Sequence, residues 1–318
     1  MQNVFISVVV TAYNRKDFLL EALTSVVNQT LSRDKYEIIC VKNYKEKQID
    51  DYIERNGIKS VLALDLPVGQ YIYIGLEKAK GNVITFLDDD DLFSKDKLER
   101  VYDAFLKHDI GFYHNDCFKG NTPLLDPLRV KDEGDCKIIK NYFFHSVSIK
   151  RATFNMSSIA VKTSIISKYK EEFRKVTANS DVFVLLLALF ERQVLFLDGN
   201  KLTFYRLHDK NVSYHRNLEK AINFDVNLAV PALQSQLKLS KLQGSPAGMR
   251  VINSLLFYSY TTVDILKKEK KSKLLKDSIR YFPWLFLTDS RLVKRVLFIL
   301  MYLVGSKFPY KRLTRNMD

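Results

Sequence analysis

Four consecutive aspartates, Asp88 to Asp91, directly follow an apolar run that starts at Ile84. Adjacent carboxylates repel one another, so folding alone gives no reason to place four together. A single aspartate here would be an ordinary helix cap, because a loop that leads from a strand into a helix favours that residue. Mg²⁺ and Mn²⁺ prefer carboxylate oxygens, and Mg²⁺ often completes its coordination shell with substrate phosphates. The cluster therefore indicates a divalent-cation site that holds a phosphate-bearing ligand.

Strand-like and helix-like patterns alternate around this cluster. Short β-branched or aromatic runs predict strands at 4–13, 37–41, 61–66 and 82–87. Helices are predicted after each strand, at 19–27, 45–55, 69–80 and 95–108. The first of these helices has Asp17 as its candidate cap. Four alternations of strand and helix indicate an α/β fold with a mainly parallel sheet and helices on both faces. Ligands bind at the carboxyl ends of the strands in such a sheet, and the aspartates lie at one of these ends.

The remaining chain is less regular at first and then helical. Loops and short strands are expected from about 110 to 150, followed by a strand at 158–162 and a buried helix at 182–190. Two further short strands are predicted up to His208. Beyond residue 216 no strand pattern persists, so we predict a catalytic domain at 1–216 and a basic helical region at 217–318.

Composition restricts the class of protein. The 318 residues are 47% hydrophobic, which suffices for a sizeable core. The three cysteines form no CxxC pair, so we expect neither a zinc site nor a disulfide framework, and we expect a reducing, cytoplasmic compartment. The longest uncharged apolar run near the C-terminus has ten residues, whereas a bilayer span needs about 20.

The net charge of +14 is concentrated near the C-terminus. Residues 265–318 contain 14 Lys and Arg against four Asp and Glu, a balance of +10. Leu, Phe and Tyr residues and Trp284 stand among these cations, which is typical of helices that lie in a membrane interface and contact anionic head groups. The alternative is a helical extension with a solvated basic face. Nucleic acid is not the expected partner, because no nucleic-acid-binding motif accompanies the charge.

Four segments in consistent order resemble glycosyltransferase family 2. They are "ISVVVTAYNRKDFLLEALTSVVNQT" (6–30), "AKGNVITFLDDDDLFSKDKLERV" (79–101), "FNMSSIAVKTSII" (154–166) and "YRLHDKNVS" (205–213). The resemblance covers roughly residues 4–213. It implies a GT-A-like fold and an inverting enzyme that takes a sugar from a nucleotide-diphosphate sugar.

The resemblance also implies which residues bind the nucleotide. The first strand ends in Thr11, Ala12 and Tyr13, which would line the base pocket, with Tyr13 stacking on the base. Asn14 and Arg15 form the turn that would meet the nucleotide.

For the donor, the resemblance implies that Asp88 approaches the ribose or donor sugar, with Asp89 beside it. Asp90 would hold Mg²⁺ or Mn²⁺ against the diphosphate, and the metal would neutralise charge on the leaving group. His208 falls where this family often places a histidine near the diphosphate, sometimes as a metal ligand. An ordinary loop histidine is the equally weighted alternative.

Two departures from the family concern the nucleotide. The family usually has paired acidic residues after the second strand, whereas this chain has Lys42 and Asn43. Asn43 could still accept the base N–H through its amide oxygen, but Lys42 reverses a local charge. The family's Arg-Asn pair is replaced by "LPVGQ" at 66–70, so nucleotide identity stays open.

The resemblance implies a general base at the start of the helix after the 158–162 strand, and Asp181 is the candidate there. A helix N-terminus would lower its pKa and keep it ionised. The alternative is that Asp181, or Ser180 before it, only caps the helix.

These inferences predict a metal-dependent inverting glycosyltransferase on the inner face of the cytoplasmic membrane, acting on a lipid-linked glycan or a polysaccharide. One alternative is a polyprenyl-phosphate sugar synthase, whose phosphate acceptor needs no general base. Another is a non-catalytic module on the same fold that binds membrane or nucleic acid.

Overall fold

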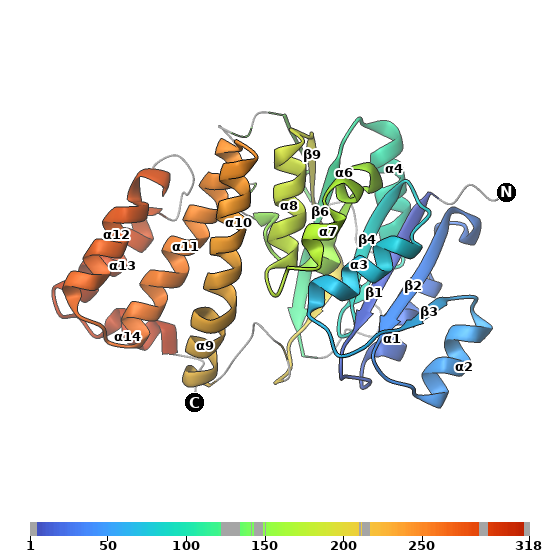
Figure 1. Ribbon diagram of the computed structural model, residues 1–318, viewed down its shortest axis with the longest axis horizontal. Helices are drawn as coiled ribbons and strands as arrows, with labels where there is room; N and C mark the ends of the chain where they lie inside the picture. The colour runs from blue at the N-terminus through green and yellow to red at the C-terminus, as the bar shows by residue number, and fades with distance from the viewer. Residues whose placement is uncertain are drawn as a thin grey trace. The chain divides into compact units, whose positions relative to one another are not determined.

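The computed structural model describes residues 5–121, 134–140, 142, 149, 151–209, 211, 217–285 and 292–314. The chain divides into two compact units (Figure 1). Unit 1 comprises residues 1–140 and 152–207, and unit 2 comprises residues 141–151 and 208–318. The C-terminal part of unit 2 thus begins at His208, ahead of the predicted boundary at 216/217, and residues 141–151 also belong to this unit.

Unit 1 is built on a mixed sheet that has nine strands among the described residues. The strands are β1 (Ile6–Ala12), β2 (Tyr36–Lys42), β3 (Lys59–Leu62), β4 (Val83–Asp88), β5 (Leu92–Phe93), β6 (Phe112–Gly120), β7 (Lys137–Ile139), β8 (Ile159–Lys162) and β9 (Leu195–Arg206). Their order is β3-β2-β1-β4-β8-β6-β9-β5, with β7 paired to β9. The sheet is parallel from β3 to β4, and β8 then pairs antiparallel with both β4 and β6. The α/β architecture predicted from the sequence is confirmed.

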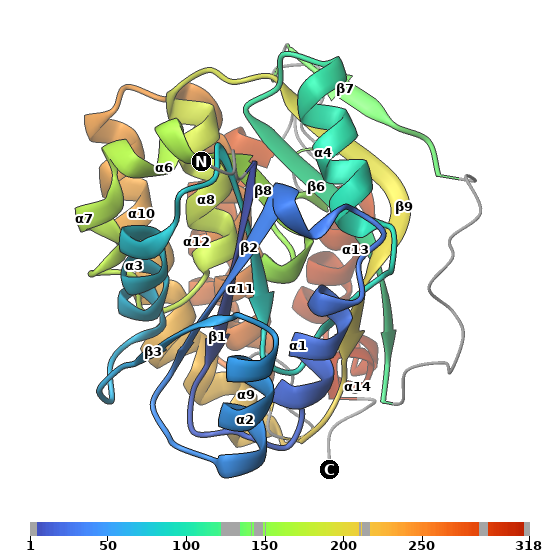
Figure 2. The same cartoon turned by 90° about the vertical axis from the view of Figure 1, so that its right-hand side faces the viewer.

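Helices cover both faces of the parallel half (Figure 2). The helices of unit 1 are α1 (Leu19–Val27), α2 (Lys47–Arg55), α3 (Val68–Lys78), α4 (Lys97–Lys107), α6 (Thr163–Lys168), α7 (Lys170–Phe173) and α8 (Ser180–Phe190). Apolar side chains of α1, α2 and α4 pack on one face, and α3 packs on the other. The eight residues Val182 to Leu189 of α8 are all buried, as the sequence predicts.

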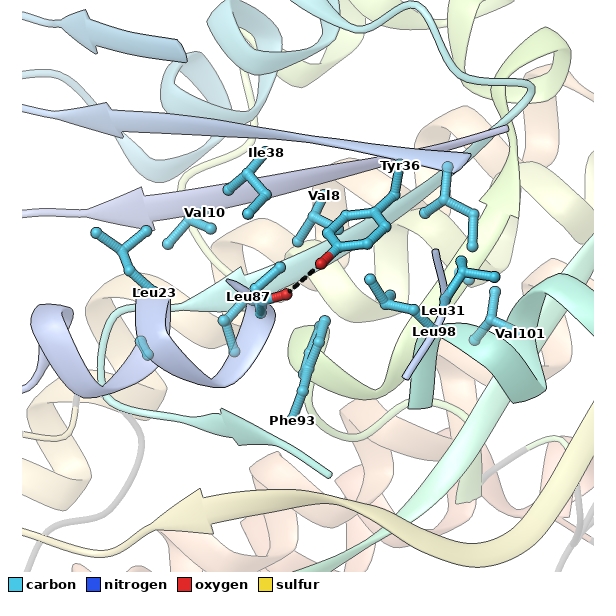
Figure 3. Packing of buried hydrophobic residues seen from close by; sticks show 14 of the residues in the cluster. Val8, Val10, Leu23, Leu31, Tyr36, Ile38, Leu87, Phe93, Leu98 and Val101 are labelled. Atoms are coloured by element: carbon cyan, nitrogen blue, oxygen red, sulfur yellow. Dashed lines mark hydrogen bonds between the residues drawn. The ribbon is translucent and has the colours of Figure 1, made fainter. Parts of the chain in front are cut away.

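The central strand β1 is buried on both faces, which explains its uninterrupted apolar sequence. Val8 and Val10 point into the core formed with α1 and α4, where Leu98 also lies (Figure 3). In the same core the Tyr36 hydroxyl donates to the Val26 carbonyl oxygen at 3.0 Å. On the opposite face Val9 meets α3 at Gly75, where an added Cβ would lie 2.4 Å from a Val9 methyl group. Only glycine lets α3 approach the sheet so closely.

Several details differ from the sequence-based expectation. The two short strands expected before His208 are one strand of 12 residues, β9. The irregular region expected from 110 begins with the nine-residue strand β6. The sequence pattern did not predict this strand over its full length, because it contains the polar segment "HND". That segment is stabilised by pairing with β8 and β9 on its two sides, which a sequence pattern does not reveal. Asp17 is not the cap of α1, because Phe18 stands at that position and makes no side-chain cap bond.

Unit 2 is helical in its described part, which confirms the predicted change of pattern. It contains α9 (Leu218–Phe224), a π-turn (Asp225–Ala229), α10 (Val230–Leu242), α11 (Pro246–Leu266), α12 (Lys271–Leu285), α13 (Leu292–Leu303) and α14 (Phe308–Thr314). The Tyr260 and Tyr281 rings stack between α11 and α12 with centroids 5.6 Å apart. Within the described ranges, every helix falls short of the length and apolar character required to cross a membrane.

The core of unit 1 predicts a large difference between two leucines of α4. Leu98 is fully buried, whereas Leu106 is 57% exposed. Leu98→Ala should lower the free energy of unfolding by about 2–5 kcal/mol, because it removes packed methyl groups and leaves a cavity. Leu106→Ala on the same helix is the matched control and should change it by less than about 0.5 kcal/mol. Urea unfolding measures both, and equal losses would contradict the assigned core.

Candidate active site

Three strand ends bring the predicted site residues to one edge of the sheet. Thr11 of β1 pairs with Asp88 of β4 on one side and with Val41 of β2 on the other. Tyr13 and Asn43 therefore emerge beside the aspartate cluster, at the carboxyl ends of parallel strands. Of the predicted base-pocket residues, Ala12 is fully buried, whereas Tyr13 is 48% exposed.

The aspartates form a compact anionic cluster. Asp88, Asp90 and Asp91 each offer one carboxylate oxygen, and these atoms lie within 4.8 Å of one another. Burial, together with neighbouring Asp90 and Asp89, raises the pKa of Asp88 to about 8. Burial is also the main cause that raises the pKa of Asp89, to about 7, and that of Asp91 well above its ordinary value. A nearby cation would favour the ionised forms.

One carboxylate oxygen in this cluster indicates where such a cation fits. Asp91 is fully buried, and its Oδ1 accepts from the Arg206 backbone N–H at 3.1 Å. Its Oδ2 has no hydrogen-bond partner in the described part of the chain. A buried, unsatisfied carboxylate oxygen is costly unless an ion or a proton binds it. A divalent cation would therefore fit this cluster, and it would be held by Asp88, Asp90 and Asp91.

Arg15 is the cation that contacts the cluster directly. Its guanidinium lies 2.7 Å from Asp90 Oδ2 and also pairs with Asp89. The Asp89 carboxylate is only 4% exposed, so this ion pair accounts for one of the four charges. Arg15 was predicted to meet the nucleotide, and in this structure its partners are carboxylates.

Two further basic residues lie near the aspartate turn, and one of them, Arg206, bonds to it directly. Arg206 Nε donates to the Asp90 carbonyl oxygen at 3.0 Å, and its NH2 group lies 2.6 Å from Glu21. Lys97 is fully buried, and its Nζ donates to Thr203 Oγ1 at 2.9 Å. Burial lowers the pKa of Lys97 well below its ordinary value, and the negative charge of Asp91 opposes that shift.

The turn after β1 contains two of the residues predicted to bind the nucleotide, Asn14 and Arg15. Asn14 has φ of +53°, and its backbone N–H donates to Asn43 Oδ1 at 2.9 Å. The Asn43 amide donates back to Asn14 Oδ1 at 2.8 Å, so the two predicted residues lie in contact. The Tyr13 hydroxyl donates to Asp65, an exposed carboxylate after β3. An aromatic ring, an amide and a carboxylate thus lie together where β1, β2 and β3 end.

Lys42, the charge reversal noted in the sequence, is directed away from this surface. It is 2% exposed, and its Nζ lies 2.8 Å from Asp50 of α2. The same Nζ donates to the Tyr44 carbonyl oxygen at 2.6 Å. Its positive charge is therefore paired with a carboxylate on α2.

Asp181 lies in the first turn of α8. Its Oδ2 accepts from the Asn155 backbone N–H at 3.0 Å, and its Oδ1 accepts from the Val182 N–H at 2.8 Å. The N-cap is Asn179, so neither Asp181 nor Ser180 holds that position. The expectation that the helix N-terminus lowers its pKa is wrong, because burial dominates and raises the pKa of Asp181 to about 6. Its negative charge also contributes to the raised pKa of Asp88, so the two carboxylates are electrostatic neighbours.

His208 belongs to unit 2. Its backbone N–H donates to Asn211 Oδ1 at 2.7 Å, and its ring Nε2 lies 3.3 Å from the Asn211 amide nitrogen. A role for His208 as a metal ligand stays a prediction.

Comparison with known proteins identifies the family of the segment that contains the aspartate cluster. Residues 7–159 match the family model of Glycosyl transferase family 2. This segment belongs to glycosyl transferase family 2. It contains β1 to β4 and the aspartate cluster, whereas Asp181 and His208 lie beyond the matched residues.

Curated relatives match about a third of this chain. A poly(ribitol-phosphate) beta-glucosyltransferase from Bacillus spizizenii is 33% identical over 104 residues, which are 30% of this chain and 16% of that protein. A minor teichoic acid biosynthesis protein from Bacillus subtilis is 33% identical over 119 residues, or 32% of this chain and 12% of that protein. The chain therefore spans only a small part of the length of these curated relatives.

Solved structures resemble the chain over nearly its whole length. S. aureus TarS in complex with UDP-GlcNAc superposes with a TM-score of 0.62 at 13% identity, covering 98% of this chain and 91% of that one. The mannosyltransferase PcManGT from Pyrobaculum calidifontis, in complex with GDP-Man and Mn²⁺, gives a TM-score of 0.56 at 14% identity, with coverage of 98% and 83%. These likenesses establish the fold, and the GT-A-like prediction is confirmed.

Within unit 1, sequence reasoning missed Asp65 and Arg206 and gave Asp91 no role of its own. Asp65 follows a short edge strand, and only its contact with Tyr13 places it at the site. Arg206 lies in the "YRLHDKNVS" segment, which pointed to the region but not to its bonds with Asp90 and Asp91. Asp91 belongs to the predicted cluster, but its unsatisfied oxygen could not be foreseen.

Proposed function

We propose that this protein is a metal-dependent inverting glycosyltransferase that moves a sugar from a nucleotide-diphosphate sugar to a hydroxyl acceptor. The observation that carries the proposal is the joint placement of Asp88, Asp90 and Asp91 beside Tyr13 and Asn43 at the carboxyl edge of the sheet. The relatives support it, since one is named a glucosyltransferase and the superposed structures contain UDP-GlcNAc or GDP-Man.

The donor would lie across the ends of β1, β2 and β4. Tyr13 is exposed and offers its ring to a nucleobase, and Asn43 or Asp65 would accept a base N–H. Asp88 would contact the ribose or the donor sugar, which orients the anomeric carbon for attack. Positioning of this kind supplies a large part of the rate in group transfer.

Asp90, with Asp88 and Asp91, would hold the Mg²⁺ or Mn²⁺ ion. When bound, such an ion neutralises charge that develops on the departing nucleoside diphosphate. One of the superposed structures contains Mn²⁺, which supports this assignment. Arg206 holds the backbone of the turn through the Asp90 carbonyl oxygen, so the carboxylates would need little rearrangement.

Asp181 would act as the general base. In an inverting transfer the acceptor hydroxyl attacks from the face opposite the leaving group, and its proton moves to a carboxylate as the new C–O bond forms. A pKa of about 6 leaves Asp181 mostly ionised at neutral pH and makes it a better proton acceptor than an ordinary aspartate.

We further propose a cell-surface polymer or a lipid-linked glycan as the acceptor, with the enzyme on the inner face of the cytoplasmic membrane. The teichoic acid name of one relative and the ribitol-phosphate name of another support a polymer acceptor. The charge of +10 in residues 265–318 supports contact with anionic lipid.

Donor binding should stabilise the folded protein. Mn²⁺ together with one member of a nucleotide-sugar panel should raise the melting temperature of the wild-type protein, because ligands that bind only the folded state stabilise it. Asp90→Asn should lose the Mn²⁺-dependent part of this shift. Unchanged stabilisation in Asp90→Asn, or no stabilisation by any nucleotide sugar, would contradict the proposal and favour a non-catalytic module.

The pH dependence of turnover should report Asp181. Because its pKa is raised to about 6, the base becomes protonated as pH falls through that value, and kcat should fall with it. Asp181→Asn should lower kcat by about 10²- to 10⁴-fold and remove this limb of the profile. A nearly unchanged rate would instead indicate a phosphate acceptor, as in a polyprenyl-phosphate sugar synthase, which needs no base.

Arg15 should compete with the metal, because its guanidinium pairs with Asp90, a predicted metal ligand. Arg15→Met should therefore strengthen Mn²⁺ binding by about tenfold in the absence of donor, as expected for removal of a partly buried ion pair. Electron paramagnetic resonance of free Mn²⁺ measures this affinity at pH 8. Lys16→Met, which removes an exposed neighbouring cation, is the control for net charge, and an equal gain there would contradict direct competition.

A further inference from the structure

Helix α13, the turn after it and the start of α14 present large apolar side chains to solvent. Leu297 is 53% exposed, Leu300 50%, Met301 38%, Val304 81% and Phe308 53%. Leu297, Leu300, Met301 and Val304 are spaced so that they lie along one side of α13 and its C-terminal turn, and Phe308 begins α14. Single exposed apolar residues are ordinary on protein surfaces, but these four at helical spacing, with Phe308 on the next helix, form an apolar stripe.

This stripe is not the side by which α13 packs on its own unit. Ile299 of α13 is 5% exposed, so it lies on the buried side of the helix. The Phe298 ring meets Phe308 edge-on, with centroids 6.4 Å apart, which joins α13 to α14. The helix therefore has one packed side and a second apolar side that faces outward.

Cations accompany the stripe. Lys307, Lys311 and Arg312 are exposed in the segment that follows α13 and in α14. The surrounding residues 265–318 carry a balance of +10. Exposed apolar side chains bordered by Lys and Arg are the pattern of helices that lie in the plane of an anionic membrane surface.

We propose that the α13 stripe, defined as Leu297, Leu300, Met301, Val304 and Phe308, inserts into the interface of a bilayer that contains anionic lipids. With 12 residues, α13 is roughly 18 Å long, which is short of the roughly 30 Å hydrocarbon core. It would therefore lie along the surface, with Lys307, Lys311 and Arg312 at the head groups. This assignment deepens the proposed function, on which it rests for a membrane-borne acceptor.

The test uses co-sedimentation of the full chain with phosphatidylglycerol-containing vesicles. Leu300→Gln with Val304→Gln should lower the bound fraction about tenfold without adding charge, because two inserted apolar groups are lost. Leu242→Gln is the matched control, since Leu242 is 82% exposed on α10, outside the basic segment, and it should bind as the wild type does. Lys311→Gln with Arg312→Gln should also weaken binding and reduce its dependence on salt.

Three results would overturn the assignment. One is equal vesicle binding by the Leu300→Gln/Val304→Gln variant, and another is equal binding of the wild type to purely zwitterionic vesicles. The third is a wild-type dimer in solution that the same variant converts to a monomer, without vesicle binding, because a second copy would then cover the stripe. Stabilisation by nucleotide sugar and Mn²⁺ is measured on the same samples in solution, so failure of membrane binding is distinguished from failure of the proposed activity.

Discussion

The arrangement of unit 1 depends on how four adjacent carboxylates are compensated at the end of β4. Burial raises the pKa of Asp88, Asp89 and Asp91, so their ionised forms need nearby positive charge. Arg15 provides this charge on the open side, through Asp89 and Asp90. On the inner side Arg206 bonds to the backbone and side chain of the turn. The cluster is thus partly neutralised by protein groups, and the unsatisfied oxygen of Asp91 leaves a position that a divalent cation would complete.

The sheet brings the aspartate cluster together with the other residues of the candidate site. Parallel pairing of β1 with β2 and β4 brings Tyr13, Asn43 and the aspartates to a common edge, although they are far apart in the sequence. Close packing of α3 on β1 through Gly75, and of α1 and α4 on the opposite face, fixes the strand ends. The aromatic ring and the anionic cluster are consequently held by a buried framework, and little conformational entropy is lost when a ligand binds there.

Much of this could be predicted from the sequence because it depends on local patterns. The apolar strands, the buried helix α8 and the clustered aspartates follow from periodicity and charge. The partners of Arg15 could not be foreseen, since its turn and the aspartate turn meet only through the pairing of β1 with β4. The pKa of Asp181 was misjudged for a related reason: the helix N-terminus is visible in the sequence, but the burial that outweighs it is not. Polar strand β6 was hidden because pairing on both sides, not side-chain pattern, stabilises it.

The account is tested most directly by anomalous diffraction from crystals soaked with MnCl₂ and a nucleoside diphosphate. We expect one strong manganese peak about 2 Å from carboxylate oxygens of the aspartate cluster, with the Arg15 guanidinium displaced from Asp90. A map in which the Arg15–Asp90 ion pair is intact and manganese is absent from the cluster would contradict it.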